Sequence, residues 1–471
     1  MLTDSLLAGL LLALPRAAPL HTPPTDRVEV LPSVTLLCGD NNVNIQGTTD
    51  GLVDSYFGVP FAAPPVGNLR FRAPEDLEWN TTLWIASQHA PARIQSKKAM
   101  YTAKHGTSED CLYLNVQVPA GIDRDRSALP VLFWVFGRGW DAGATVFYDG
   151  TFLVNQSIHT NQPVIFVSVN YRLGALGFLN GPEAVSEHAA NLGARDVLKA
   201  LRWVSKHIGA FGGDPAAVTV FGESAGAMII SYLYLSPGID LFRAAIMQSG
   251  APSSMPLVRT ADAWPEVFDA LFDFAGCGGN STARQMCDSA VECLRRAPVE
   301  DILLAQEKVK NFTQYQDAFL FAPSIDGDLI PDSPAKLLSQ GRFAHIPFIS
   351  GCMKDEGTYF VPPAHIPQNK SLIPSVFSRR FPGGVDSNTL DELFAHVYPD
   401  IPAVGSPFDT GNNTFGLSPS YKQLSALVGD TMFQAPRRGF LSEAVAHEHT
   451  ETWSYHLETV LPTFPPQYGG W

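Results

Sequence analysis

Residues 217–235 read AVTVFGESAGAMIISYLYL, and they indicate the fold class more clearly than any other part of the chain. The first five, AVTVF, are a short β-branched run typical of a fully buried strand. The apolar run at 225–235 predicts a helix that begins directly after the short turn GES. The stretch therefore predicts a strand, a tight turn and a helix, the unit from which α/β folds are built.

The same alternation continues on both sides of this unit. The runs PVLFWVF at 130–136 and PVIFVSVN at 163–170 are bounded by turn residues and predict buried strands. Residues 191–208 carry apolar side chains at helical spacing, which predicts a crossover helix. The expected fold class is α/β, with a large, mostly parallel central sheet flanked by helices. Its other elements are expected as strands at 244–248, 346–350 and 452–457, a helix at 437–446, and helical caps within 262–304 and 371–397.

The turn in the first unit carries a G-x-S-x-G motif at residues 222–226. Small residues beside Ser224 permit a sharp turn that holds its hydroxyl above the C-terminal edge of the sheet. The backbone N–H of Ala225 would face the negative oxygen that forms when the serine attacks a carbonyl. A second glycine-rich turn, GRGW at 137–140, follows an expected strand and could supply further N–H donors. Ordinary glycine turns are the alternative for both.

Four segments resemble the type-B carboxylesterase and lipase family, which includes the cholinesterases and secreted fungal lipases. Residues 211–226 match its serine signature, and residues 109–116 are similar to its second signature, from which Gln117 departs. Residues 57–71 and 170–179 are also similar. The resemblance implies one domain of α/β-hydrolase fold over residues 27–471, which cleaves carboxylic esters through a covalent acyl-enzyme without a cofactor or a metal.

The resemblance also assigns roles to individual residues. Ser224 would be the nucleophile and Glu356 the acidic member of a catalytic triad, because GCMKDEG at 351–357 matches the acidic loop of the family. Asp355 is the local rival, and Glu223 would be a supporting charge. The oxyanion hole would be formed by Ala225, Gly139 and Arg138. Arg138 replaces the middle glycine of the family's loop, and its guanidinium could instead hold an acidic group of the substrate.

Other residues resemble structural features of the family. Arg70 with Glu109 and Arg172 with Asp196 match its ion pairs. Cys277 with Cys293 matches a family disulfide. Cys111 has no partner, because the family's usual position falls near Arg93 or Ile94. The remaining cysteines without an expected partner are Cys38, Cys287 and Cys352.

The catalytic histidine is where the resemblance ends. The family places it in a loop after the last strand, and the histidines that follow Glu356 are His365, His396, His447, His449 and His456, none at such a position. We expect it near position 472 or 473 of a longer product, so this chain would be truncated and nearly inactive. The alternative from another class is a non-catalytic, cholinesterase-like binding or adhesion protein.

Charge and targeting signals point outside the cell. The net charge is −14 with no basic run, which argues against a nucleic-acid partner. Residues 1–18 resemble a signal peptide, whose apolar run is too short for a transmembrane anchor, so secretion is expected. The sequence leaves the particular ester and the oligomeric state open. Candidate glycosylation triplets begin at Asn80, Asn155, Asn280, Asn311, Asn369 and Asn412.

Overall fold

A computed structural model describes residues 31–470 except 40, 96–105, 255–259, 261–262, 264, 280, 313–318, 362–365, 367–369, 379–383, 461–462 and 464. The expected signal peptide, His365, Asn280 and Asn369 lie outside the described residues.

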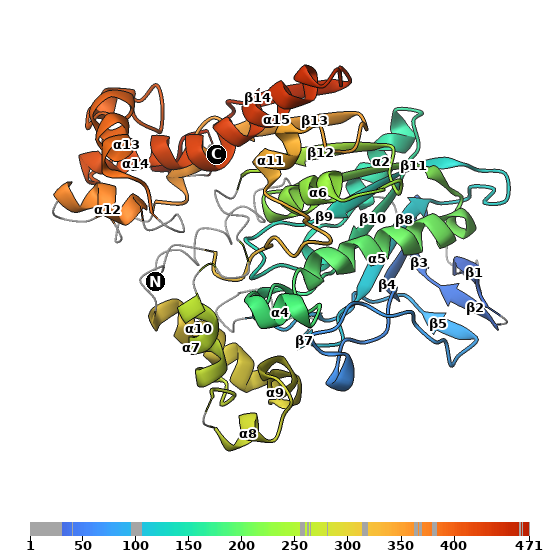
Figure 1. Ribbon diagram of the computed structural model, residues 1–471. Coiled ribbons are helices and arrows are strands. Elements are labelled where there is room, and N and C mark those ends of the chain that lie inside the picture. The colour runs from blue at the N-terminus through green and yellow to red at the C-terminus, as the bar shows by residue number, and fades with distance from the viewer. Residues whose placement is uncertain are drawn as a thin grey trace.

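A nine-stranded sheet forms the centre of the molecule, with the order β14-β13-β12-β11-β9-β10-β8-β4-β3 (Figure 1). The six strands from β14 to β10 are parallel, and β8, β4 and β3 complete one side in antiparallel pairing. The strands are β3 (Thr48–Thr49), β4 (Val53–Pro60), β8 (Tyr113–Pro119), β9 (Leu129–Val135), β10 (Ile165–Val169), β11 (Gly213–Glu223), β12 (Ala244–Gln248), β13 (Phe348–Met353) and β14 (Thr452–Leu457).

The expected elements are confirmed with small changes at their ends. Strand β12 and strand β14 have the predicted bounds, and so does helix α6 (Ala225–Leu235). Strand β11 is longer than the apolar run that predicted it, because it begins at Gly213. The sheet is mostly parallel as expected, and the antiparallel strands β8, β4 and β3 were not foreseen.

Helices flank the sheet and form two further groups outside it (Figure 1). Helices α5 and α6 pack on β11, and α2 packs on β8 and β10. Helices α7–α10 begin within the first region expected as a cap, and α12 and α13 lie within the second, whereas α14 lies beyond it. The α-helices are α2 (Thr151–His159), α3 (Gly174–Gly177), α4 (Pro182–Ser186), α5 (Leu192–His207), α6, α7 (Pro265–Phe274), α8 (Thr282–Gln285), α9 (Ala290–Arg296), α10 (Val299–Phe312), α11 (Pro334–Ser339), α12 (Ile373–Ser378), α13 (Ser387–Glu392), α14 (Pro419–Gly429) and α15 (Ala435–Ala446).

Two small sheets complete the N-terminal part of the chain. One has the order β1-β2-β5 and the other pairs β6 with β7. Val34, Leu36, Val43 and Ile45 point from β1 and β2 into the main core, where each is at most 5% exposed. The five strands are β1 (Ser33–Cys38), β2 (Asn41–Gln46), β5 (Leu83–Ile85), β6 (Ala92–Arg93) and β7 (Thr107–Ser108).

The two ion pairs implied by the family lie between segments distant in the chain. Arg70 donates to both carboxylate oxygens of Glu109 at 2.7 Å. Arg172 donates to Asp196 at 2.8 and 2.6 Å, and both side chains are fully buried. A buried pair of this kind costs several kcal/mol to break, because one charge is left without a partner.

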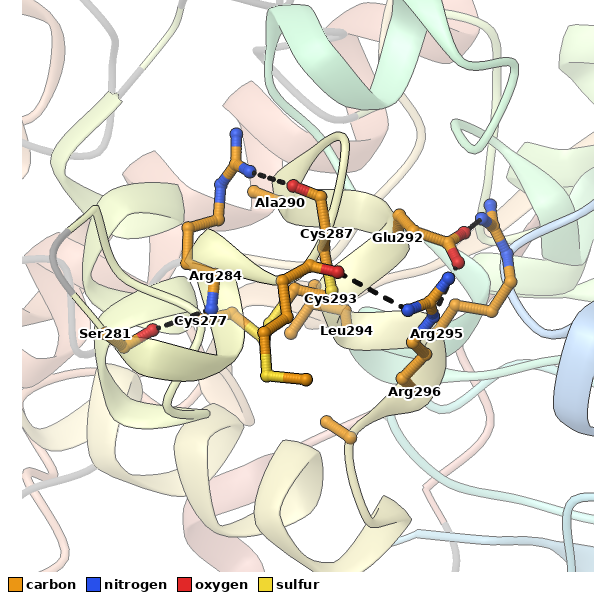
Figure 2. The surroundings of a disulfide bond; sticks show 12 residues. Cys277, Ser281, Arg284, Cys287, Ala290, Glu292, Cys293, Leu294, Arg295 and Arg296 are labelled. Atoms are coloured by element: carbon orange, nitrogen blue, oxygen red, sulfur yellow. Dashed lines mark hydrogen bonds and ion pairs between the residues drawn. A yellow bond between two sulfur atoms is a disulfide. The ribbon is translucent and has the colours of Figure 1, made fainter.

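A disulfide joins Cys277 to Cys293 across 16 residues, with a Cα–Cα distance of 5.7 Å. This is the pair that the resemblance implies. Figure 2 shows it beside helix α9, where Glu292 bridges Arg295 and Arg296. The described cysteines outside a disulfide are Cys38, Cys111, Cys287 and Cys352.

Candidate active site

Ser224 lies between the end of β11 and the start of α6, in a backbone conformation of φ 53° and ψ −122°. An L-residue with this φ stores strain of about 1–3 kcal/mol, so the surrounding structure must hold it. The Ser224 N–H donates to the carbonyl of Gln248 at 2.8 Å, and the Ser224 carbonyl accepts from the Met228 N–H at 2.9 Å. These bonds fix the turn at both ends.

The glycines of the motif are required because strand β9 lies directly beneath the turn. A Cβ atom at Gly226 would lie 2.1 Å from the carbonyl oxygen of Val135, and one at Gly222 would lie 2.6 Å from the same atom. Neither position has room for a side chain. The motif therefore reflects the packing of β11 and α6 against the end of β9.

The turn after β9 lies against Ser224. A Cβ atom at Gly137 would be 2.5 Å from Oε2 of Glu223 and 2.9 Å from Cβ of Ser224. Arg138, Gly139 and Trp140 all have positive φ, at 71°, 64° and 61°. The loop is thus held in an unusual backbone conformation beside the serine.

A small, nearly filled hollow with about 10 Å³ of open volume lies at the serine. Ser224, Ala225 and Gly139 line it together, so the structure brings these three site residues to one place. Arg138 is not among its lining residues, although its charge acts on Glu223. The rest of the lining is mainly apolar and consists of Trp140, Met228, Phe319, Phe360, Met432 and Phe433.

Glu356 begins a 3₁₀ turn directly after β13 and is 3% exposed. Its Oε1 accepts from the Met353 N–H at 2.8 Å, and Ser249 hydrogen-bonds to the carboxylate. Burial raises the pKa of Glu356 to about 7, against these two hydrogen bonds. Ser249 was missed from the sequence; its position just beyond β12, at the same sheet edge, was the available signal.

Glu223 is a second carboxylate of this site. Burial, followed by the charge of Glu356, raises the pKa of Glu223 to about 7, and Arg138 acts in the opposite direction. Two carboxylates in this environment resist being charged at the same time. The protonation of Glu223, the residue before Ser224, is therefore linked to the charge of Glu356.

Asp355, the rival to Glu356, is occupied by other contacts. Its Oδ1 accepts from the Ser406 hydroxyl at 2.7 Å and from the Phe408 N–H at 2.8 Å. Its Oδ2 accepts from the Gly470 N–H at 2.8 Å. Asp355 therefore has a structural role, because these hydrogen bonds connect Gly470 and residues 406–408 to the acidic loop.

The described histidines after Glu356 make their contacts elsewhere. His449 is buried and bonds to the carbonyl of Ile346 at 2.9 Å. His447 approaches the Ser339 carbonyl, and His456 contacts Gln434 and Glu458. His396 is exposed on the π-helical segment Leu393–Val397. The partners of His447, His449 and His456 are thus residues other than Ser224 and Glu356.

The sheet order and the sharp strand-to-helix turn at Ser224 define an α/β-hydrolase fold. A family model described as "Carboxylesterase family" matches residues 32–465. Lipase 2 of Geotrichum candidum is 35% identical over 467 residues, which cover 90% of this chain and 80% of the relative. Secreted lipase 1 of Botryotinia fuckeliana (strain B05.10) is 34% identical, over 92% of this chain and 78% of the relative. The crystal structure of Aspergillus niger EstA superposes with a TM-score of 0.76 at 28% identity, over 91% of this chain and 77% of that one.

The chain belongs to the carboxylesterase family and is a serine-type carboxylic ester hydrolase. Its relatives are lipases and esterases, which does not favour the alternative of a non-catalytic binding protein. Within the part of the chain that the structure describes, no helix has the length and apolar character needed to cross a bilayer.

Proposed function

We propose that Ser224 is the nucleophile of this hydrolase and that Glu356 is the acidic member of its triad. The observation that carries the proposal is the strained backbone of Ser224, held by hydrogen bonds at the mouth of the apolar hollow. Strain of this kind persists where the surrounding structure over-determines it, which is common at active sites. The position of Glu356 after β13, a parallel strand separated from β11 only by β12, supports its role.

The chemistry proceeds in two steps. The Ser224 hydroxyl attacks the ester carbonyl, and its proton passes to a histidine base that lies outside the residues that the structure describes. The carbonyl oxygen becomes an oxyanion that accepts from the N–H groups of Ala225 and Gly139. The third donor is the Arg138 N–H. Collapse releases the alcohol, which takes the proton, and leaves an acyl group on Ser224. Water then repeats the sequence and releases the acid, while Glu356 orients the base throughout.

The lining of the hollow supports an ester with an apolar acyl group. Phe319, Phe360, Met432 and Phe433 offer no charge to a substrate acid group, and Met side chains adapt to irregular apolar shapes. Two relatives bear the name lipase, which agrees with this choice. We therefore propose neutral esters with apolar acyl chains as the substrate class.

The place of action that we propose is outside the cell. Relatives described as secreted support it. We propose residues 1–18 as a signal peptide and 27–471 as the hydrolase domain. Asn80, Asn311 and Asn412 are exposed glycosylation candidates, whereas Asn155 is half-buried on α2.

The test is covalent labelling with an alkyl fluorophosphonate, with and without added imidazole. The phosphonate forms an irreversible adduct, so labelling can be mapped by peptide mass spectrometry even where turnover is slow. We expect the adduct on Ser224, faster labelling with imidazole as the base, and none in Ser224→Ala. Ser231→Ala, a buried serine on α6, is the control and should label normally. An adduct on another serine, or none with imidazole, contradicts the assignment.

A further inference from the structure

A second, larger hollow of about 760 Å³ lies beside β1 and β2 of the small sheet. Its walls come from the end of β1, the start of β2, the end of β4, residues 76–79 and the last turns of α5. None of its lining residues lines the hollow at Ser224. Its volume falls within the range of small-molecule sites, roughly 300–1,000 Å³.

Basic side chains line one wall of this hollow. Lys199, Arg202 and Lys206 follow each other at helical spacing on α5, so they share one face of the helix. Lys199 pairs with Asp76 at 2.5 Å. Arg202 and Lys206 are exposed, and neither forms an ion pair with any residue that the structure describes. Arg202 and Lys206 thus place two positive charges at the wall of the hollow.

The charge of Lys206 reaches several groups in the hollow. It contributes to lowering the pKa of Asp76, and it opposes the rise in the pKa of the Cys38 thiol that burial causes. Burial, with a smaller effect from Lys206, lowers the pKa of His207 to about 4. The acidic groups of the lining are Asp76, already paired, and Glu78. Asp40, in the turn between β1 and β2, lies outside the described residues.

Two indole rings complete the lining. Trp79 is half-buried and packs edge-on against Trp84, with centroids 5.8 Å apart. Trp203 lies 5.2 Å from the ring of His207 and is 8% exposed. The face of an aromatic ring carries partial negative charge and attracts the C–H groups of a ligand such as a sugar ring.

We propose that this hollow is a binding site for an anionic saccharide, a sugar that carries sulfate or carboxylate groups. The guanidinium of Arg202 and the ammonium of Lys206 contact the anionic groups, and Trp79 contacts the sugar ring. The net charge of −14 does not prevent this, because salt screens distant charges beyond a Debye length of about 8 Å. The site is separate from ester hydrolysis and does not rest on the assignment of Ser224.

The experiment is calorimetric titration of the full chain with a sulfated tetrasaccharide, a uronate tetrasaccharide, a neutral tetrasaccharide and inorganic sulfate. We expect saturable binding of at least one anionic tetrasaccharide and weaker binding of the neutral sugar and of sulfate alone. Arg202→Gln with Lys206→Gln should weaken binding about tenfold or more, because charge-assisted hydrogen bonds are lost. Both side chains are exposed, so the variant should keep its fold.

Three controls make the result decisive. Arg243→Gln removes an exposed cation that does not line the hollow and should leave affinity within about twofold. Ser224→Ala should bind unchanged. Trp79→Ala should weaken the tetrasaccharide and leave inorganic sulfate unaffected. The proposal is overturned if neither anionic sugar binds, if the double variant binds as well as the parent chain, or if the neutral sugar or sulfate alone binds equally well.

Discussion

Ser224, Arg138 and Trp140 adopt positive φ although each carries a Cβ atom. L-residues pay about 1–2 kcal/mol for left-handed backbone, so the fold must supply this free energy from its packing. At Ser224 this conformational free-energy cost lies at the residue that we propose as the nucleophile. At Arg138 the family pattern has a glycine, and the cost here comes from the side chain alone.

Arg138→Gly should therefore stabilise the protein. We expect the free energy of unfolding to rise by about 1 kcal/mol relative to Arg138→Ala, since only glycine relieves the positive φ. The pair of variants removes the same charge, so their difference reports the backbone. Urea denaturation at pH 8 measures it, and equal stability of the two variants would contradict the strain.

Glu356 should make the stability of the protein depend on pH, because its pKa is raised in the folded state. The folded state holds its proton up to a pKa of about 7, whereas the unfolded chain releases it near the ordinary 4.5. Between these values the folded state binds more protons, so the free energy of unfolding falls as pH rises from about 4.5 to 7. Glu356→Gln should remove about 3 kcal/mol of this fall.

Urea denaturation between pH 4.5 and 8 measures the slope of the parent chain and of Glu356→Gln. Gln keeps an oxygen for the Met353 N–H and carries no charge, so the variant should be the more stable at pH 8. Glu75→Gln, at an exposed position, is the control and should leave the slope unchanged. If the free energy of unfolding of the parent chain did not change between pH 4.5 and 8, the raised pKa of Glu356 would be contradicted.

At the scale of elements, one carboxylate joins three segments. Asp355 connects the turn after β13 to residues 406–408 and to Gly470, 115 residues further along the chain. The Thr358 hydroxyl donates to the Tyr468 carbonyl at 3.1 Å, and the Tyr421 hydroxyl donates to the Gln467 carbonyl at 3.0 Å. The segment 467–470 is thereby fixed beside the loop that carries Glu356.

Asp355→Asn tests this connection. The amide NH₂ would face the N–H of Gly470, so a donor would meet a donor and the free energy of unfolding should fall by about 2 kcal/mol. Hydrogen exchange at the Gly470 amide should become faster. Asp409→Asn is the matched control; its partner is Lys354, its side chain is 83% exposed, and it should cost under about 1 kcal/mol. Equal losses in both variants would contradict the anchoring role.

At the scale of the whole molecule, repulsion among the excess negative charges lowers the stability of the folded state. With a formal net charge of −14, the folded chain repels itself at neutral pH. Added salt screens this repulsion more than it weakens the buried ion pairs.

The unfolding temperature at pH 8 should therefore rise by a few degrees when NaCl is increased from 10 to 200 mM. Differential scanning calorimetry measures it, with an uncharged osmolyte at matched osmolality as the control. A lower unfolding temperature in salt would show that attractive surface pairs outweigh the net repulsion.

The sequence predicted the elements whose signal is local. The apolar runs at β11 and α6 gave their ends within a few residues, and the motif around Ser224 indicated the turn between them. Contacts between distant segments had no such signal. The anchoring role of Asp355, the bond from Ser249 to Glu356 and the walls of the larger hollow depend on the tertiary fold. The antiparallel pairing of β8 with β10 and β4 was also unpredicted, because an apolar run of sequence does not specify which strands it pairs with.

The hydrogen bond between Asp355 and Gly470 also limits when the acidic loop can be completed during synthesis of the chain. A ribosome adds roughly 5–20 residues per second, so the 115 residues that separate these partners take on the order of ten seconds to make. During that interval the parallel strands before β14 can already pair outside the exit tunnel. Residues 467–470 reach the acidic loop only after this interval, so we expect the nascent chain to form the sharp turn at Ser224 before the loop of Glu356 is fixed in place.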